Sequence, residues 1–303
     1  MRSIRAPLRS ALLVFLAVSV AGCGPAVRFA YNNADYGLRF LAHEYFDLHG
    51  AQADAVKAQL ELLHAWHRHE ELPRYAAAFD DAARRVERGL KREDVEWAVA
   101  ILRERTRALF VQAADEAAPL LPLIDEHNIA ALEKKIKSEN EKYEHDFLSH
   151  DAARNERERF KRLRDRFEEW TGNLDSGQEA LIAQFAHSTQ NYVKPWYESR
   201  KLRQREFVDL LRTGRGSPDL SSRLQKFLLA WDQHRSPEHA RLAADQERAF
   251  VQLVVDLDGT LSSKQRARAV KKLERYADDC RTLAEEGKPK AREQRAETSN
   301  LRG

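Results

Sequence analysis

The sequence predicts an all-α protein, an elongated bundle of long, amphipathic and highly charged helices. The 303 residues include only 12 glycines and 9 prolines, well below the usual shares of about 7% and 5%, so few turns interrupt the chain. The other residues are rich in Ala, Leu, Glu, Arg and Lys, which favour helices. Runs that alternate apolar and polar residues, which mark half-buried strands, are lacking.

The N-terminal segment has the three parts of a secretory signal. A positive head precedes an apolar run, which ends in small residues: Arg2, Arg5 and Arg9, then 11–20, then 20–23. The apolar run is too short for a membrane-spanning helix, which needs about 20 residues. We therefore expect residues 1–22 to be a removable signal peptide.

The sequence Val-Ala-Gly-Cys at 20–23 resembles the lipobox of bacterial lipoproteins. This resemblance implies that Cys23 is lipidated and anchors the mature chain to a membrane outside the cytoplasm. Gly24 after the cysteine resembles the outer-membrane sorting of Gram-negative cells, which implies a protein that faces the periplasm. The alternative is a secreted protein that has a cysteine at this site by chance.

The charge and the cysteine content limit the partners and the covalent links that the chain can have. Loss of the three signal arginines takes the formal charge from +3 to zero. The remaining charges are mixed in sign, which disfavours a nucleic-acid partner, and we expect none. With Cys23 lipidated, Cys280 is the one cysteine left, and no intramolecular disulfide can form. We expect Cys280 to be a buried apolar side chain on a helix.

An aromatic-rich segment, 27–46, begins close to the expected anchor. Only Gly24, Pro25 and Ala26 separate it from Cys23, and so few residues reach about 10 Å. Its aromatic side chains pack in the core or lie in the membrane interface. They are Phe29, Tyr31, Tyr36, Phe40, Tyr45 and Phe46.

The stretch HAWHRHEELPRY, residues 64–75, places His64, His67 and Glu71 on one helical face, as metal ligands would lie. The His-Glu-x-x-His pattern is absent. We expect Pro73 to end or kink the helix at Leu72, which puts the histidines in a last turn where the helix dipole favours protonated imidazole. The sequence therefore predicts no metal, no cofactor and no catalytic residue here.

The same stretch carries a family resemblance, together with the lipobox, RFAYNNADYGLRF at 28–40 and FEEWTGNLDSGQ at 167–178. These segments are similar to a family of uncharacterised bacterial lipoproteins, a domain of unknown function. The resemblance implies a helical, membrane-anchored protein and a structural role in the core for seven residues. They are Trp66, His67, Arg68, Glu71, Leu72, Pro73 and Tyr75.

Helical periodicity continues through 128–170. Two apolar stripes follow helical spacings. Ile129, Leu132, Ile136 and Tyr143 are spaced three, four and seven apart, and Phe160, Leu163, Phe167 and Trp170 three, four and three. The polar stretch 149–159 between them predicts either an antiparallel turn near 149–151 or one long bridging helix.

Two further helices are marked by a capping serine before a proline at the first helical position, Ser217-Pro218 and Ser236-Pro237. After Gly287 the chain is polar and basic, and we expect 287–303 to be a disordered tail. Residues 23–286 then form the helical domain.

The stretch LVVDLDGTL, residues 253–261, resembles the nucleophile strand of haloacid-dehalogenase-type phosphatases. Only about forty residues follow it, too few for the rest of that fold, so we interpret it as a helix end. In this interpretation the helix ends near Asp258, Gly259 takes the left-handed position, and Ser262 caps the next helix.

Capping boxes occur in two similar pentads, Leu-Ser-Ser-Lys-Gln at 261–265 and Leu-Asp-Ser-Gly-Gln at 174–178, with a looser copy at 48–52. They resemble the LTxxQ signature of small periplasmic chaperones that bind unfolded polypeptides on a cradle of helices.

We therefore expect a membrane-anchored periplasmic lipoprotein that binds rather than catalyses. The first hypothesis is a holdase-like envelope module that binds unfolded polypeptide or other envelope proteins. The alternative is a structural envelope protein that binds one specific partner by helix packing. An enzyme would need a pocket with convergent polar residues, and the sequence predicts none.

Overall fold

The computed structural model describes residues 24–148, 151–230 and 236–286. All regular elements in these ranges are helical, which confirms the all-α prediction. The elements are α2 Gly24–Asn32, α3 Ala34–Phe46, α4 Ala51–Trp66, the π-helical turn η1 His67–Glu71, α5 Leu72–Glu87, α6 Arg92–Ala117, the 3₁₀ turn η2 Ala118–Leu123, α7 Glu126–Phe147, α8 Ala152–Thr171, α9 Ser176–Ser188, the 3₁₀ turn η3 Gln190–Tyr192, α10 Val193–Gly214, α11 Leu220–Leu229, α12 Pro237–Thr260 and α13 Ser263–Glu286. The expected signal peptide 1–22, Cys23 and the expected tail 287–303 lie outside the described residues.

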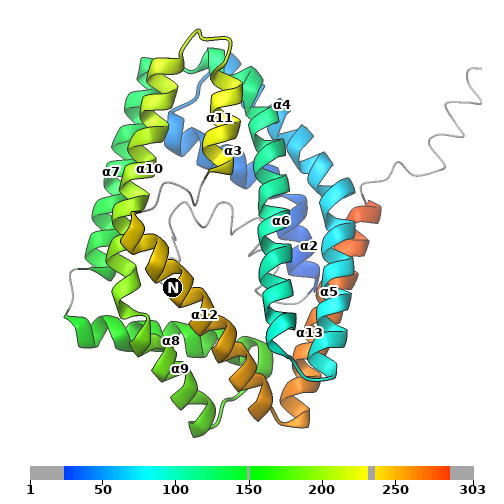
Figure 1. Ribbon diagram of the computed structural model, residues 1–303. Coiled ribbons are helices and arrows are strands. Elements are labelled where there is room, and N and C mark those ends of the chain that lie inside the picture. The colour runs from blue at the N-terminus through cyan, green and yellow to red at the C-terminus, as the bar shows by residue number, and fades with distance from the viewer. Residues whose placement is uncertain (1–23, 149–150, 231–235, 287–303) are drawn as a thin grey trace, which may run out of the picture.

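The helices form an open frame rather than a single cylinder of parallel rods (Figure 1). Helices α7 and α10 run side by side along one edge, and α5 packs along α13 at the other. Helices α8 and α9 close one end, and α12 crosses between the two edges. Each helix buries one apolar stripe against its neighbours and exposes its polar faces. Long helices of this kind, joined by short links, produce this shape.

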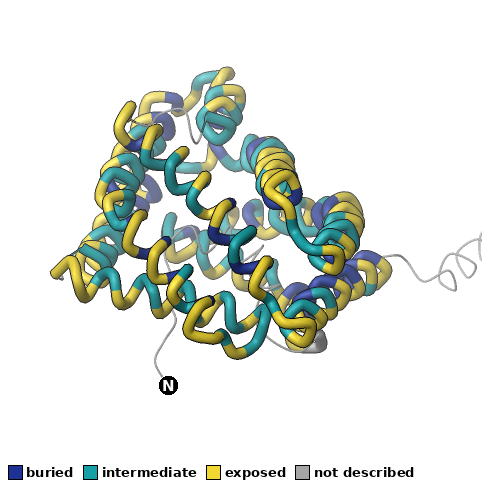
Figure 2. The backbone as a smooth tube through the Cα atoms, turned by 60° about the horizontal axis from the view of Figure 1, so that its bottom comes forward, coloured by how far each residue is buried: buried dark blue, intermediate teal, exposed yellow. Residues whose placement is uncertain are grey.

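The core is divided into three apolar clusters. Figure 2 shows buried residues as short patches along the helices rather than as one central mass. One cluster joins α7, α10 and α11, a second joins α2, α5 and α13, and a third joins α8, α9 and α12. Their most buried members are Ile129, Ala277 and Ile182, each with no exposed surface.

The two predicted apolar stripes at 128–170 pack in different clusters. Ile129 and Leu132 are buried in the α7–α10–α11 cluster, whereas Phe160 and Phe167 pack against the α8–α9–α12 cluster. Helix α7 ends at Phe147 and α8 begins at Ala152, with residues 149 and 150 outside the described ranges. The chain is therefore neither one long helix nor an antiparallel pair here, because α7 packs on α10 and α8 on α9 and α13.

One predicted serine cap is confirmed and the other is wrong. Ser236 accepts a hydrogen bond from the His239 N–H at 3.1 Å, and α12 begins at Pro237. Helix α11 begins at Leu220 instead of Pro218, because the Leu220 N–H bonds to the Ser217 carbonyl in a separate turn. The Ser217 hydroxyl donates to the Asp219 carboxylate and so does not cap a helix.

The two predicted capping boxes are confirmed, and they meet. Asp175 and Ser262 accept the backbone N–H groups of Gln178 and Gln265, which start α9 and α13. The two glutamines then pair through both amides, with Nε2–Oε1 distances of 3.1 and 2.9 Å. Gln178 is fully buried, so these hydrogen bonds satisfy polar groups that water cannot reach.

The starts of α4 and α7 are joined in the same way. Gln52 Nε2 donates to Asn128 Oδ1 and to the Leu123 carbonyl, both at 2.8 Å. Asn128 Nδ2 in turn donates to the Phe46 carbonyl at 2.8 Å. Each of the two amide pairs thus joins two helix starts that lie more than 75 positions apart in the chain. The two pairs themselves lie at opposite ends of the frame in Figure 1.

Candidate functional site

The HAWHRHEELPRY stretch forms the π-helical turn and continues into α5. The Leu72 N–H bonds to the carbonyl of His67, five residues earlier, which is the π pattern. Proline lacks an N–H and clashes with the carbonyl of the preceding turn, so the wider turn accommodates Pro73. The rod changes direction here without ending, so the expected kink is present and the expected helix end at Leu72 is wrong (Figure 1).

His67 is 1% exposed, and its Nδ1 lies 2.9 Å from the hydroxyl of Tyr31. Burial, reinforced by the positive charges of His64 and Arg68, lowers the pKa of His67 to about 3. The imidazole is therefore neutral near pH 7. The expected protonated imidazole is wrong, because the sequence placed this ring at a solvated helix end and the fold places it beneath α2.

Glu71 is fully buried, and its charge is matched by arginines. Its Oε1 accepts hydrogen bonds from Arg74 at 2.8 Å and from Arg105 of α6 at 3.3 Å. Arg68 donates to the Leu283 carbonyl of α13 and to Asn32 of α2, both at 2.7 Å. These contacts join the π-helical turn η1 to α2, α6 and α13.

The other residues of the motif lie around this cluster. Trp66 is half-buried with its ring edge on His67, and Tyr75 meets the same imidazole at 5.4 Å between ring centroids. Leu72 is buried beside Tyr31, and Pro73 is exposed. None of these residues lines either of the two best-defined surface pockets of the described chain. The motif is thus a buried polar cluster, and its hydrogen bonds and ring contacts hold neighbouring helices together.

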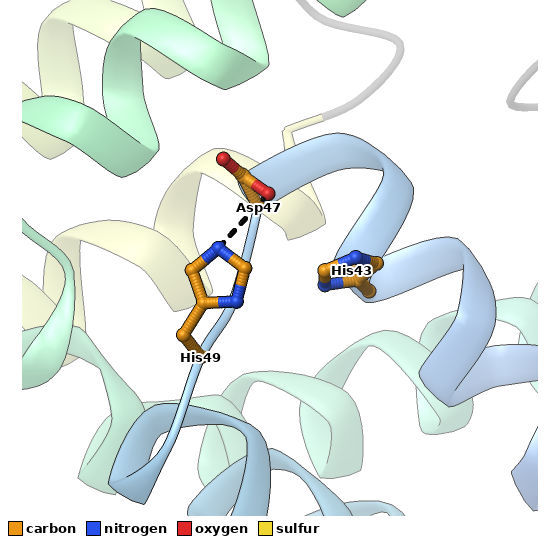
Figure 3. Close-up of side chains that lie close together, drawn as sticks. All are labelled: His43, Asp47 and His49. Atoms are coloured by element: carbon orange, nitrogen blue, oxygen red, sulfur yellow. Dashed lines mark ion pairs between the residues drawn. The ribbon is translucent and has the colours of Figure 1, made fainter.

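The residues His64, His67 and Glu71 do not form a ligand cluster in the described structure, but another set does. His43, Asp47 and His49, at the end of α3 and in the link to α4, bring one ligand atom each within 4.8 Å of one another (Figure 3). Sequence reasoning passed over this set. The spacing His-x₃-Asp-x-His is the signal that could have found it.

The LVVDLDGTL stretch lies in the last turns of α12, which runs through Gly259 to Thr260. Gly259 is not among the left-handed glycines of the described chain, so that part of the prediction is wrong. The buried Asp258 forms an ion pair with Arg266 at 2.8 Å and accepts the Leu90 N–H at 2.8 Å. This aspartate joins α12, α13 and the link between α5 and α6, a structural position rather than that of a nucleophile.

The aromatic segment beside the expected anchor divides into two faces. Val27 and Tyr31 are buried against α13, as the core interpretation requires. Phe29, Tyr36 and Phe40 are exposed by 72, 69 and 58%. Tyr36 and Phe40 are four positions apart and lie on one side of α3, whereas Phe29 lies on α2, before the break at Asn33.

No exposed residue of 26–42 is charged, although a third of the whole chain is. The three charged side chains in this range are only part-exposed and are paired: Arg28 with Asp279 of α13, and Arg39 with Asp35. The exposed surface of α2 and α3 that bears Phe29, Tyr36 and Phe40 is therefore uncharged, and we call it the aromatic face.

A surface groove of about 530 Å³ runs between α7 and α10. Its floor is apolar, formed by Ile136, Tyr197 and Val208. Its rim carries charges of both signs, namely Glu133, Lys137, Glu141, Glu144, Lys201, Arg205 and Asp209. The groove is open and lacks the convergent buried polar groups of a catalytic pocket.

None of the helices in the described ranges is both long enough and apolar enough to cross a membrane. No curated protein and no solved structure matches the chain. A family model matches residues 44–240, about two thirds of the sequence, and it names no enzyme. The matched range contains the π-helical turn, the groove and one of the two paired glutamines. The chain belongs to this family, the family of unknown function DUF6279.

Proposed function

We propose that the protein is a lipid-anchored envelope protein that faces the periplasm and acts by binding rather than by catalysis. Holdase-like binding of unfolded polypeptide is the first form of this activity. Binding of one specific envelope partner is the second.

The observation that carries the proposal is the aromatic face, which begins six residues after Cys23. Aromatic rings gather at the level of lipid headgroups, and an amphipathic helix lies there with its apolar side toward the acyl chains. A single acyl chain binds a membrane only weakly, whereas two or more chains, or one chain plus a second contact, give stable anchoring. The lipidated cysteine and the aromatic face together supply two membrane contacts of this kind.

Binding rather than catalysis is supported by the two polar sites of the fold. The centre around His67 and Glu71 is buried and crosslinks helices. The α7–α10 groove is open, with an apolar floor and a rim of both charges. Such a surface suits a polypeptide segment of mixed sequence better than a small substrate, which needs an enclosed pocket.

The anchor is tested in cells by labelling with a radioactive fatty acid, followed by membrane fractionation. We expect label in the protein and recovery with the membranes. Cys23→Ser should lose the label, and Cys280→Ser, the control at the buried cysteine, should keep it. A wild-type protein that takes up no label and fractionates with the soluble periplasm would contradict lipid anchoring.

Holdase activity is tested by light scattering of a chemically unfolded client mixed with the protein at near-equal molar amounts. We expect suppressed scattering. A photo-crosslinking residue at Lys137 on the groove rim should capture the client, and one at Lys142 on the same helix, outside the groove, should not. Unchanged scattering, or equal capture at both positions, contradicts binding of clients in the groove.

The specific-partner function has its own observation. Outside the aromatic face, the large exposed apolar residues of the described ranges are single side chains on separate elements: Leu62, Leu102, Leu123, Leu202 and Phe250. Scattered residues give little area for unselective capture of unfolded chains. With the Lys137 probe in living cells, one discrete adduct supports this function, and a broad smear of adducts supports the holdase.

A further inference from the structure

We propose that His43, Asp47 and His49 form a binding site for a divalent transition-metal ion such as Zn²⁺. The site goes beyond the proposed function, and it does not depend on lipidation or on client binding.

The three side chains face one another across the end of α3 (Figure 3). His43 lies in the last turn of α3, and Asp47 is the left-handed residue that follows the end of that helix. His49 follows in the link to α4, and its Nε2 lies 3.2 Å from Asp47 Oδ1. Ligand atoms around a tetrahedral Zn²⁺ lie roughly 3.3 Å apart. The three ligand atoms here lie within 4.8 Å of one another, so small side-chain movements bring them to that spacing.

His43 is already held as a metal-ligating histidine is held. Its Nδ1 lies 3.0 Å from the carbonyl oxygen of Leu48, which can only accept a hydrogen bond. The proton is therefore on Nδ1, and the lone pair of Nε2 is left for an ion. Donation of the second ring N–H to a backbone carbonyl orients the imidazoles of metal sites.

The link that carries the ligands has a fixed backbone. Asp47 has φ of 50°, the one non-glycine residue of the described chain with a positive φ, and Gly50 has φ of 51°. Asp47 is the left-handed cap that ends α3, and its N–H bonds to the His43 carbonyl. The buried Leu48 and the bond from Asn128 to the Phe46 carbonyl hold both sides of the link.

A third imidazole approaches from α7. His127 Nε2 lies 2.9 Å from Asp47 Oδ2. It orients the carboxylate and so joins the site to a second helix. Two imidazoles with one carboxylate form a set that suits Zn²⁺, Ni²⁺ or Cu²⁺, whereas Mg²⁺ and Ca²⁺ prefer oxygen ligands.

The test is calorimetric titration with ZnCl₂ of the full chain in detergent, purified with a histidine-free tag. We expect one ion per chain, no binding of Mg²⁺, and at least about tenfold weaker binding in His49→Gln and Asp47→Asn. Co²⁺ in place of Zn²⁺ should give a visible absorption band that both variants lose. Both substitutions are at partly exposed positions, so melting temperatures without metal should stay near that of the wild type.

The matched control is His187→Gln. His187 is 68% exposed and lies 3.1 Å from Glu156, whereas His49 is 67% exposed and lies 3.2 Å from Asp47. His187 does not belong to a ligand cluster of the described chain. Unchanged Zn²⁺ affinity in this control supports the site. Equal weakening in the control, equal affinity of His49→Gln and the wild type, or no Zn²⁺ binding at all would overturn it.

Discussion

Protonation of the buried imidazole should make the fold sensitive to acid. The pKa of His67 is lowered to about 3, from 6.5 for an exposed imidazole. Below pH 6.5 the unfolded chain binds a proton that the folded chain does not bind until about pH 3. The stability that the neutral His67 contributes is therefore fully present above pH 6.5, and it is lost as the pH falls from 6.5 toward 3.

The size of the loss follows from proton linkage. Each pH unit between the two pKa values changes the free energy of unfolding by about 1.4 kcal/mol. Between pH 6.5 and pH 5, His67 alone should lower the free energy of unfolding by about 2 kcal/mol. The pKa of His64 is also lowered by burial, so its effect has the same sign.

Urea unfolding followed by circular dichroism, at pH 7 and pH 5, measures this effect. Other titrating groups contribute in every variant, so the comparison is between the wild type and His67→Gln, which keeps a polar group beside Tyr31. The wild type should lose about 2 kcal/mol more than this variant between the two pH values. The exposed control His187→Gln should behave as the wild type. Equal losses in the wild type and His67→Gln, or an NMR titration in which His67 protonates near pH 6.5, would refute the reasoning.

Three further predictions concern buried polar and sulfur groups. Asp258→Ala should lower the free energy of unfolding by about 3 to 5 kcal/mol, because Arg266 is left without its partner; Asp256→Ala, at a part-exposed carboxylate, should change urea unfolding little. Gln178→Ala should cost about 1 to 3 kcal/mol in the same assay, and adding Gln265→Ala should cost less than the sum of the two changes. Burial raises the pKa of Cys280 to about 12, so a thiol reagent at pH 8 should label it in urea and not in the folded chain; stoichiometric labelling of folded protein would contradict this.

Local pattern was sufficient for most of the helical framework. The stripe that contains Ile129 and Leu132 is buried in α7 because helical spacing alone decides which side chains share a face. The boxes at Asp175 and Ser262 formed as expected, because a cap is made by residues three positions apart. That their glutamines meet could not be predicted, since the contact joins positions 87 residues apart.

The errors have a common physical origin in contacts made across the fold. His67 is neutral because α2 supplies Tyr31 from 36 residues away, which no local pattern reports. Helix α12 passes Gly259 because Asp258 is held by Arg266 and the Leu90 N–H. The His43, Asp47 and His49 cluster is local and was accessible to sequence reasoning, whereas His127 is brought to it from 80 residues away.

The most direct test of the account places a probe on the aromatic face in native membranes. Phe40→Cys and the control Leu102→Cys, an exposed apolar position on α6, are each labelled with a fluorophore. Cys280 is buried and should stay unlabelled. Nitroxide-bearing lipids should quench the fluorophore at position 40 and leave that at 102 bright. Equal quenching at the two positions, or quenching at 40 by water-soluble agents alone, would contradict a membrane-facing role for the α2–α3 helices.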